Sequence, residues 1–233
     1  MKKLGFLIFL GVLAVGFVAA SASSFGKLDT GSIFHFDFGG IKGSGNVITQ
    51  SRDVAGFHAI EVSNALQVDV TAQKDFSVTV ETDDNIAPMV RTEVSGGVLR
   101  ISCDGKHIST SAPIRIHVSA PDLDNVEVSG ASNVSVANVK NSALGLDISG
   151  ASKVKVDGET SQLKADASGA SKIDASNLTA DNGTVSTSGA SGANVNVTGT
   201  LKADASGASH INYAGSPKDL QKKASGASSV NQQ

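Results

Sequence analysis

The sequence LKADASGASKIDA, residues 163–175, is followed 38 positions later by the closely similar LKADASGASHINY, residues 201–213. Both stretches contain the tetrapeptide SGAS, which occurs six times at intervals of 18 to 20 residues. The copies begin at Ser129, Ser149, Ser168, Ser188, Ser206 and Ser225. A unit of this length cannot bury an apolar face alone, so the period predicts a stack of coils. The segment SNAL at 63–66 resembles a degenerate earlier copy.

Within a repeat, apolar and polar residues alternate with the period of an extended strand. One parity contains Leu163, Ala165, Ala167, Gly169, Ser171, Ile173 and Ala175, and we expect this set to point inward. Glycine permits a bend and the close approach of the next coil, so Gly and Ser predict a corner. An inward hydroxyl needs a partner, which the backbone or a serine about 4.8 Å away in the next coil can provide. The predicted corner residues are Gly130, Gly150, Gly169, Gly189, Gly207, Gly226, Ser132, Ser152, Ser171, Ser191, Ser209 and Ser228.

The fold class predicted from these patterns is all-β. We expect a right-handed parallel β-solenoid with coils of about 19 to 20 residues, and a β-sandwich or β-prism built from repeated hairpins is the alternative. Segment 86–90, IAPMV, is the one place where a short helix or turn is expected. Pro217 and the lysines that follow it are expected to protect the C-terminal edge of the stack.

The N-terminus has the organisation of an exported protein. Residues 1–22 combine two lysines, an apolar run and a small-residue exit, which predicts a signal peptide; an uncleaved anchor is the alternative. Residues 23–48 are rich in Gly, Ser and Phe and are expected to be a leader or linker. Residues 49–233 then form a single solenoid domain, with an irregular β N-terminal cap at 49–125 and the SGAS repeats at 126–233. We therefore expect the protein to be located in the periplasm, at the cell surface or in the extracellular space.

Composition restricts the possible partners. The net charge is −3 and no basic stripe is present, which argues against nucleic acid or an anionic membrane as a partner. No integral membrane segment is expected once the signal peptide is cleaved. Cys103 is the only cysteine, so no internal disulfide forms, and its parity predicts a buried thiol. The five histidines lack metal-binding spacing and no G-x-S-x-G motif occurs, so we expect no enzyme, metal or cofactor.

In-register stacking would align outward residues in columns. After the corner, two columns of amides, hydroxyls and lysines could hydrogen-bond a polysaccharide or a surface protein, although aromatic platforms for sugar rings are lacking. Their candidate ligand-facing residues are Lys153, Lys172, His210, Lys155, Asp174, Asn194 and Asn212. Before the corner runs an acidic column of Glu127, Asp147, Asp166 and Asp204, which is either a cation site or a solvated face paired with lysines. The solvated face is the favoured interpretation.

Three segments, taken in their order along the chain, resemble the family known as putative auto-transporter adhesin, head GIN domain. They are IKGSGNVITQSRDVAGFHAIEVSNALQVDVTAQ (41–73), VRTEVSGGVLRIS (90–102) and the SGAS repeats, so the likeness covers roughly residues 46 to 230. The resemblance implies a bacterial exported protein with a β-helical fold and, by its label only, adhesion. It offers no catalytic residues to transfer to this sequence.

Together these observations predict a non-catalytic exported envelope or surface protein that binds a glycan or surface protein through polar columns. A purely structural envelope element without a specific ligand is the alternative. A β-helical polysaccharide-active enzyme is a third possibility, if Asp147, Asp166 and Asp174 lie close together.

Overall fold

The computed structural model describes residues 40–233, except 105–107 and 111. The expected signal peptide, and residues 23–39 of the expected leader, lie outside the described residues. The described part is built from strands and one turn of 3-10 helix, η1 (Ala87–Met89). The strands are β1 (Ile41–Lys42), β2 (Val47–Arg52), β3 (Ala59–Val62), β4 (Gln67–Ala72), β5 (Ser77–Asp83), β6 (Val90–Ser95), β7 (Val98–Cys103), β8 (Ile108–Ser109), β9 (Arg115–Ala120), β10 (Asn125–Val128), β11 (Asn133–Ile148), β12 (Lys153–Ala167), β13 (Lys172–Thr187), β14 (Gly192–Val197), β15 (Thr200–Gly207), β16 (His210–Ala214), β17 (Asp219–Gly226) and β18 (Ser229–Gln232).

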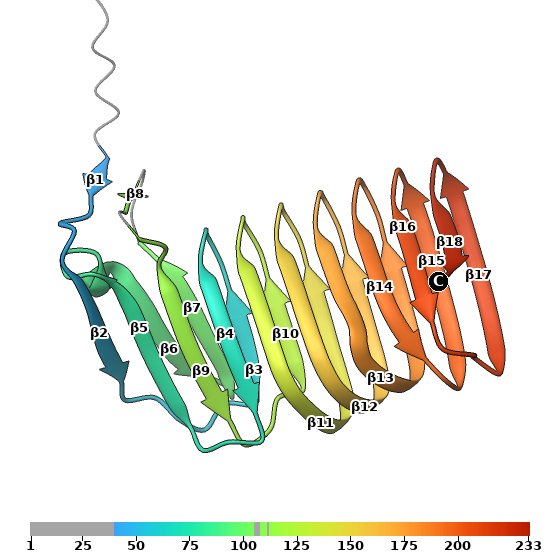
Figure 1. Cartoon of the computed structure of the whole chain (residues 1–233), viewed down its shortest axis with the longest axis horizontal. Coiled ribbons are helices and arrows are strands. Elements are labelled where there is room, and N and C mark those ends of the chain that lie inside the picture. The colour runs from blue at the N-terminus through green and yellow to red at the C-terminus, as the bar shows by residue number, and fades with distance from the viewer. Residues whose placement is uncertain (1–39, 105–107, 111) are drawn as a thin grey trace, which may run out of the picture. The chain divides into compact units, whose positions relative to one another are not determined.

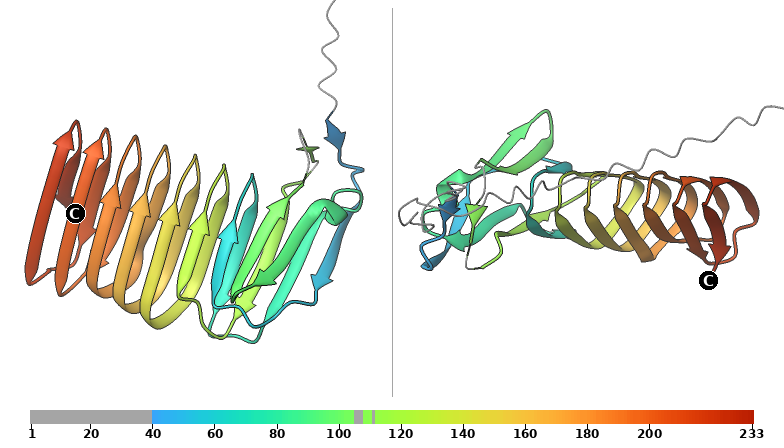
Figure 2. Two further views of the ribbon diagram at one scale, coloured as in Figure 1. Left: turned by 180° about the vertical axis from the view of Figure 1, so that it is seen from behind. Right: turned by 90° about the horizontal axis from the view of Figure 1, so that it is seen from above.

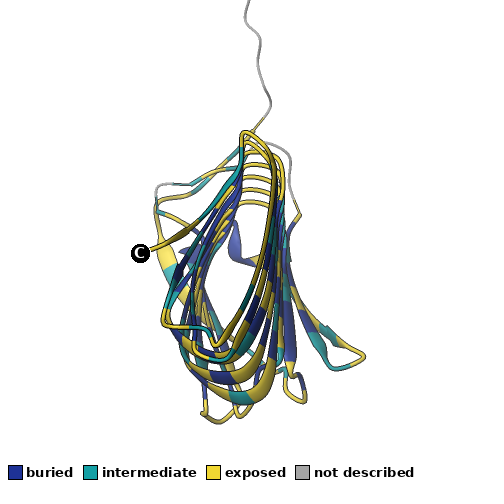
Figure 3. Cartoon of the chain, turned by 90° about the vertical axis from the view of Figure 1, so that its right-hand side faces the viewer, coloured by how far each residue is buried: buried dark blue, intermediate teal, exposed yellow. Residues whose placement is uncertain are grey.

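The predicted β-solenoid is confirmed. From β10 onward the chain winds in coils that pair in parallel and in register, and successive coils form one row (Figures 1 and 2). Each coil crosses two layers, and buried residues occur along both of them (Figure 3). Their apolar side chains form one core cluster. We call layer A the strands that precede a corner, namely β7, β3, β10, the C-terminal halves of β11–β13, β15 and β17. Layer B contains the strands that follow it, namely β9, β4, the N-terminal halves of β11–β13, β14, β16 and β18.

The N-terminal part forms the irregular cap that the sequence predicts. Strands β3 and β4 make a coil, but the chain then turns outward and builds a further coil from β7 and β9 on the N-terminal side of it. The chain then returns to the stack at β10, which pairs with the edge of β3 opposite to the edge that pairs with β7. Antiparallel strands extend both layers beyond the outermost coil, with β5 and β2 beside β9 and with β6 beside β7. The short helix expected at 86–90 is present as η1.

The paired structure begins before the expected boundary at residue 49. Strand β1 pairs in parallel with β8, and β2 pairs with β5 from Val47 onward. The loop between them is held by Asp83 and Asp84, which accept hydrogen bonds from the Gly45 amide (2.9 Å) and the Asn46 side chain (2.9 Å), respectively. The last residues of the expected leader are therefore part of the cap.

The six SGAS segments lie at one narrow corner, and here the inward parity is interrupted. The glycine of each segment has a φ between +73° and +80° and stands at the exposed apex of the turn, whereas the second serine is buried in the first five copies. A Cβ on Gly169 would lie 2.7 Å from the carbonyl oxygen of Gly150 in the preceding coil. That same oxygen accepts a hydrogen bond of 2.8 Å from the Ala170 amide. The glycine thus permits both the left-handed turn and the close stacking of the corners.

The inward serine hydroxyls are bonded chiefly to backbone carbonyls. Ser191 Oγ donates to the carbonyl oxygen of Ala167 in the preceding coil (3.0 Å) and to that of Ser188 in its own coil (2.8 Å). Ser228 makes the equivalent pair of contacts, both at 2.8 Å. A hydroxyl-to-hydroxyl contact occurs between Thr187 and Ser209, at 2.9 Å. The serines therefore join neighbouring coils through the backbone, which satisfies a buried polar group.

The interior changes in character along the stack. At β11 it is filled by Leu144, Leu146 and Ile148, whereas in later coils alanine occupies many of the equivalent positions. In the last coil the inward position beside Ala203 is Lys222, whose Nζ lies 4.7 Å from the centre of the buried Tyr213 ring. An ammonium group over an aromatic face covers the end of the core and remains hydrated.

Candidate functional site

The outward residues of layer B form two columns along the stack. Each column is continuous because the parallel register places equivalent residues of successive coils opposite each other. The first contains Arg115, Gln67, Asn133, Lys153, Lys172, Gly192, His210 and Ser229. The second contains His117, Asp69, Ser135, Lys155, Asp174, Asn194, Asn212 and Asn231. All seven predicted ligand-facing residues thus lie on one face of one layer.

Four of these seven residues come together in a single depression. Lys153 and Lys155 from β12, with Lys172 and Asp174 from β13, line a hollow of about 340 Å³. Its other lining residues are Gln67, Asp69, Asn133, Val134, Ser135 and Val154. Lys153 faces Lys172 directly across the two strands, and Lys155 faces Asp174. The hollow therefore presents three ammonium groups and two carboxylates among amide and hydroxyl groups.

The remaining three predicted residues lie further along the same face and contact one another or the scaffold. The Asn212 side-chain amide donates to Asn194 Oδ1 at 3.1 Å, which makes a short asparagine ladder. The imidazole of His210 lies over Gly192, so a Cβ added there would require the His210 ring to move. Because Asn194 and Asn212 use polar atoms on each other, part of their hydrogen-bonding capacity stabilises the stack.

The acidic column lies on layer A, on the other side of the core. In spatial order it contains Arg100, Glu61, Glu127, Asp147, Asp166, Ser186, Asp204 and Lys223. Cations pair with it at both ends, where Arg100 Nε lies 2.8 Å from Glu61 and Lys223 Nζ lies 3.4 Å from Asp204. Within the described residues, no group of three or more His, Cys, Asp or Glu side chains is arranged to hold a metal ion. Asp174 belongs to layer B, so it does not join Asp147 and Asp166 in one carboxylate cluster.

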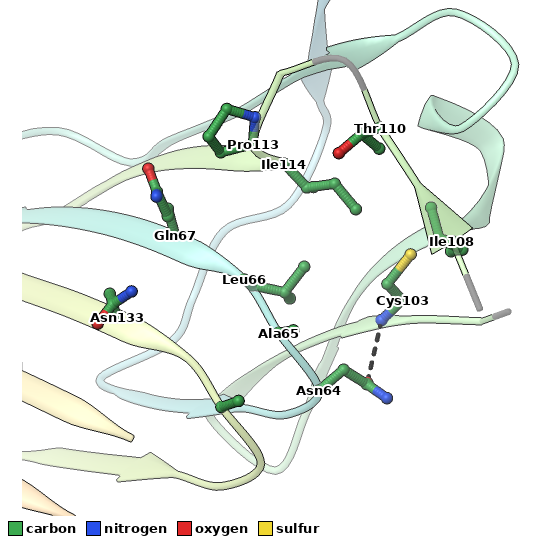
Figure 4. Close-up of a pocket in the computed structure, with 11 residues that line it drawn as sticks. Asn64, Ala65, Leu66, Gln67, Cys103, Ile108, Thr110, Pro113, Ile114 and Asn133 are labelled. Carbon is green, nitrogen blue, oxygen red and sulfur yellow. Dashed lines mark hydrogen bonds between the residues drawn. The ribbon is translucent and has the colours of Figure 1, made fainter. Parts of the chain in front are cut away.

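A second hollow, of about 430 Å³, lies beside the degenerate corner at Asn64 (Figure 4). Asn64 has φ +78°, so it adopts the left-handed conformation of the corner glycines, and its Oδ1 accepts from the Cys103 amide at 3.3 Å. Cys103 is buried as its parity predicts, and burial together with the nearby Asp104 raises the pKa of its thiol. A thiol that stays protonated is a poor nucleophile.

The columns extend further than the repeats indicate. Gln67 and Asp69 follow the SNAL segment at the same offsets as Lys153 and Lys155 follow SGAS, so their places could have been predicted from that degenerate copy. Arg115 and His117 carry no such signal, because their coil lacks the corner motif and lies out of chain order. His117 Nδ1 is 3.6 Å from Asp69 Oδ2, which adds a surface ion pair when the histidine is protonated.

Comparisons with known proteins agree with this architecture. A family model described as putative auto-transporter adhesin, head GIN domain, matches residues 56–217. Among curated proteins, none matches the chain. No helix among the described residues has the length and apolar character needed to cross a membrane.

Several crystal structures have a similar fold. A putative adhesin from Bacteroides fragilis is 20% identical with a TM-score of 0.71, and the match covers 83% of this chain and 100% of that one. Putative adhesins from Parabacteroides distasonis and Parabacteroides merdae are each 19% identical, with TM-scores of 0.52 and 0.53. These two matches cover 82% and 83% of this chain, and 99% and 98% of theirs.

Proposed function

The chain belongs to the family of putative auto-transporter adhesin head GIN domains, and from this premise we propose that it is an exported, non-catalytic binding module of the cell envelope. It contacts a glycan or a surface protein through the outward columns of layer B. The single observation that carries this proposal is the in-register alignment of those columns across successive coils. An extended ligand can contact several coils of such a face at once, and repeat proteins use their long surfaces in this way.

The absence of catalysis in this proposal rests on how the ionisable groups are arranged. The His58–Asp124 pair, with 3.0 Å between Nδ1 and Oδ2, lies on the surface, as does the His117–Asp69 pair. Within the described part of the chain, no hydroxyl or thiol hydrogen-bonds to either ring. A nucleophile activated by an adjacent base is therefore not formed at these positions.

A purely structural role in the envelope is the second candidate. The asparagine ladder and the ion pairs at the ends of the acidic column support it, because these outward groups already have partners within the stack. The two candidates differ in what the outward residues do. A structural element tolerates their replacement, whereas a binding module loses its ligand.

The first experiment is surface accessibility on intact producing cells, using an antibody against the SGAS repeats and a lysed-cell control. Labelling of intact cells supports the adhesin-like role and leads to a glycan array with the purified protein. Labelling only after lysis places the protein in the periplasm, and the structural role then becomes the leading explanation. Absence of binding to every glycan class and to whole cells would also count against the binding module.

A further inference from the structure

We infer that the hollow on layer B formed by Lys153, Lys155 and Lys172 is a binding site for an anionic polysaccharide, whose carboxylate or sulfate groups contact the three ammonium groups. This inference rests on the proposed binding function and specifies the chemical class of its ligand.

Lysines outnumber carboxylates within the hollow. Its two carboxylates already have partners, since Asp174 accepts a hydrogen bond from Ser176 Oγ and Asp69 lies 3.6 Å from His117 Nδ1. By contrast, within the ranges that the structure describes, Lys153, Lys155 and Lys172 form no ion pair with any carboxylate. A hydroxyl donor does not neutralise Asp174, so the hollow contains three lysines against two carboxylates, a formal net charge of +1, and its ammonium groups lack ion-pair partners among the described residues.

Two of the lysines occupy electrostatically unfavourable positions in the sheet. Lys153 and Lys172 are direct neighbours in the parallel ladder, so their α-carbons are about 4.8 Å apart. Like charges directly opposite each other destabilise a sheet. Layer A pairs Lys164 and Lys223 with carboxylates, at 3.6 Å and 3.4 Å. Two neighbouring lysines without a carboxylate partner among the described residues lower the stability of the fold, and a local cost of this kind is typical of a functional site.

The shape and chemistry of the hollow suit an extended anionic ligand. The hollow is open on a flat face, and its columns continue beyond it through Arg115 and His117 on one side and Asn194 on the other, so a polymer can follow them. The described aromatic rings are placed elsewhere, because Tyr213 is buried and Phe57 and Phe76 pack together with ring centres 5.0 Å apart. Neutral sugars therefore find no stacking platform in the hollow, whereas an anionic group finds charge-assisted hydrogen bonds.

The test is a binding titration of the purified protein with polygalacturonate, dextran sulfate and neutral dextran at low and high salt. We expect binding to one or both polyanions, no binding to neutral dextran, and a loss of affinity at high salt because exposed ion pairs are screened. The triple variant Lys153→Ser/Lys155→Ser/Lys172→Ser should bind about tenfold to a hundredfold more weakly, since each exposed ion pair contributes modestly. Polygalacturonate and dextran sulfate distinguish carboxylate from sulfate as the preferred group.

The matched control is Lys140→Ser/Lys164→Ser/Lys202→Ser, which removes the same charge from exposed lysines outside the hollow. It should retain affinity, and thermal unfolding of both triple variants checks that they remain folded. Equal loss in the two variants would show a nonspecific charge effect and overturn the inference. Binding of neutral glycans or cells without any effect of the three lysines would also overturn it, while leaving the proposed function intact. Lack of binding to polyanions, neutral glycans and cells would overturn both.

A second copy of the chain is the competing occupant, because the carboxylates of layer A could face the lysines. Light scattering at low salt distinguishes this case. Self-association that disappears in the Lys153→Ser/Lys155→Ser/Lys172→Ser variant, without polyanion binding by the wild type, would assign the hollow to self-assembly and overturn the inference.

Discussion

Replacing Gly169 by alanine tests whether the SGAS corner limits the stability of the solenoid. Gly169 has φ +73°, and an added Cβ would stand 2.7 Å from the carbonyl oxygen of Gly150. That distance is shorter than a carbon–oxygen contact allows, so the two corners must separate. Their separation lengthens the hydrogen bond from the Ala170 amide to the same oxygen, which is 2.8 Å in the native structure.

Two costs contribute to the expected loss of stability. Placing an L-residue in the left-handed region costs about 1–2 kcal/mol. Weakening a backbone hydrogen bond between coils adds about 0.5–1.5 kcal/mol. We therefore expect Gly169→Ala to lower the free energy of unfolding by about 2–3 kcal/mol. Gly56→Ala is the matched control, because Gly56 has φ +75° and a Cβ there would meet no atom within 4 Å. It should show only the conformational cost.

The assay is urea unfolding followed by circular dichroism and by the fluorescence of Tyr213, the only tyrosine, which is buried in the C-terminal coils. Hydrogen exchange shows which coils open, because a solenoid can unfold in parts. Loss of protection in Gly169→Ala should be centred on the corners at 149–171. Equal destabilisation by Gly169→Ala and Gly56→Ala would refute the argument, since the contact between corners would then contribute nothing.

Three further predictions concern other parts of the structure. Ser191→Ala should lower the free energy of unfolding by about 1 kcal/mol, because two carbonyl oxygens lose a donor, whereas alanine at the exposed Ser188 should have little effect in the same urea assay. Asp147→Lys should raise the free energy of unfolding by about 0.5 kcal/mol in low salt, since it replaces a carboxylate between Glu127 and Asp166; a lower free energy of unfolding would contradict this. Burial raises the pKa of the Cys103 thiol. The contribution of this shift to the free energy of unfolding is fully present below the usual thiol pKa of about 8.5. It is lost as the pH rises through the higher pKa that the thiol has in the folded protein. Maleimide labelling at pH 8 should therefore be slow until urea unfolds the protein, and rapid labelling of the folded protein would show that the thiol is accessible.

The coil stack could be predicted from the sequence because its signal is local and repeated. Alternation sets which residues of β11 to β13 face the core, and the SGAS spacing sets the register between coils. The SNAL segment fits the same scheme, because asparagine tolerates the left-handed conformation that Asn64 adopts. The exposure of the corner glycines was not predicted, because a tight turn interrupts the period-two alternation of a strand.

The path of the N-terminal part could not be predicted from the repeats. The coil of β7 and β9 lies outside the coil of β3 and β4 although it follows it in the chain, and its corner has no SGAS motif. The candidate site was predictable in part, since alternation places Lys153 and Lys172 on one face. The pairing of Asp69 with His117, and the lack of an ion pair for Lys153 and Lys172 within the described residues, depend on side-chain geometry that a repeat pattern does not contain.

The two identical nine-residue segments at 163–171 and 201–209 show how this scaffold separates stability from surface chemistry. Each segment contains a strand of layer A and the corner that follows it. The choice of side chain is restricted in the strand by packing in the core. It is restricted in the corner by the stacked glycine and the hydrogen-bonded serine. The copies first differ immediately after the corner, where Lys172 corresponds to His210 and Asp174 to Asn212. These differences occur at outward positions of layer B, where no core contact fixes the residue type. The face that varies between the copies is the face to which we assign binding, so changes in the ligand-facing residues need not disturb the stack.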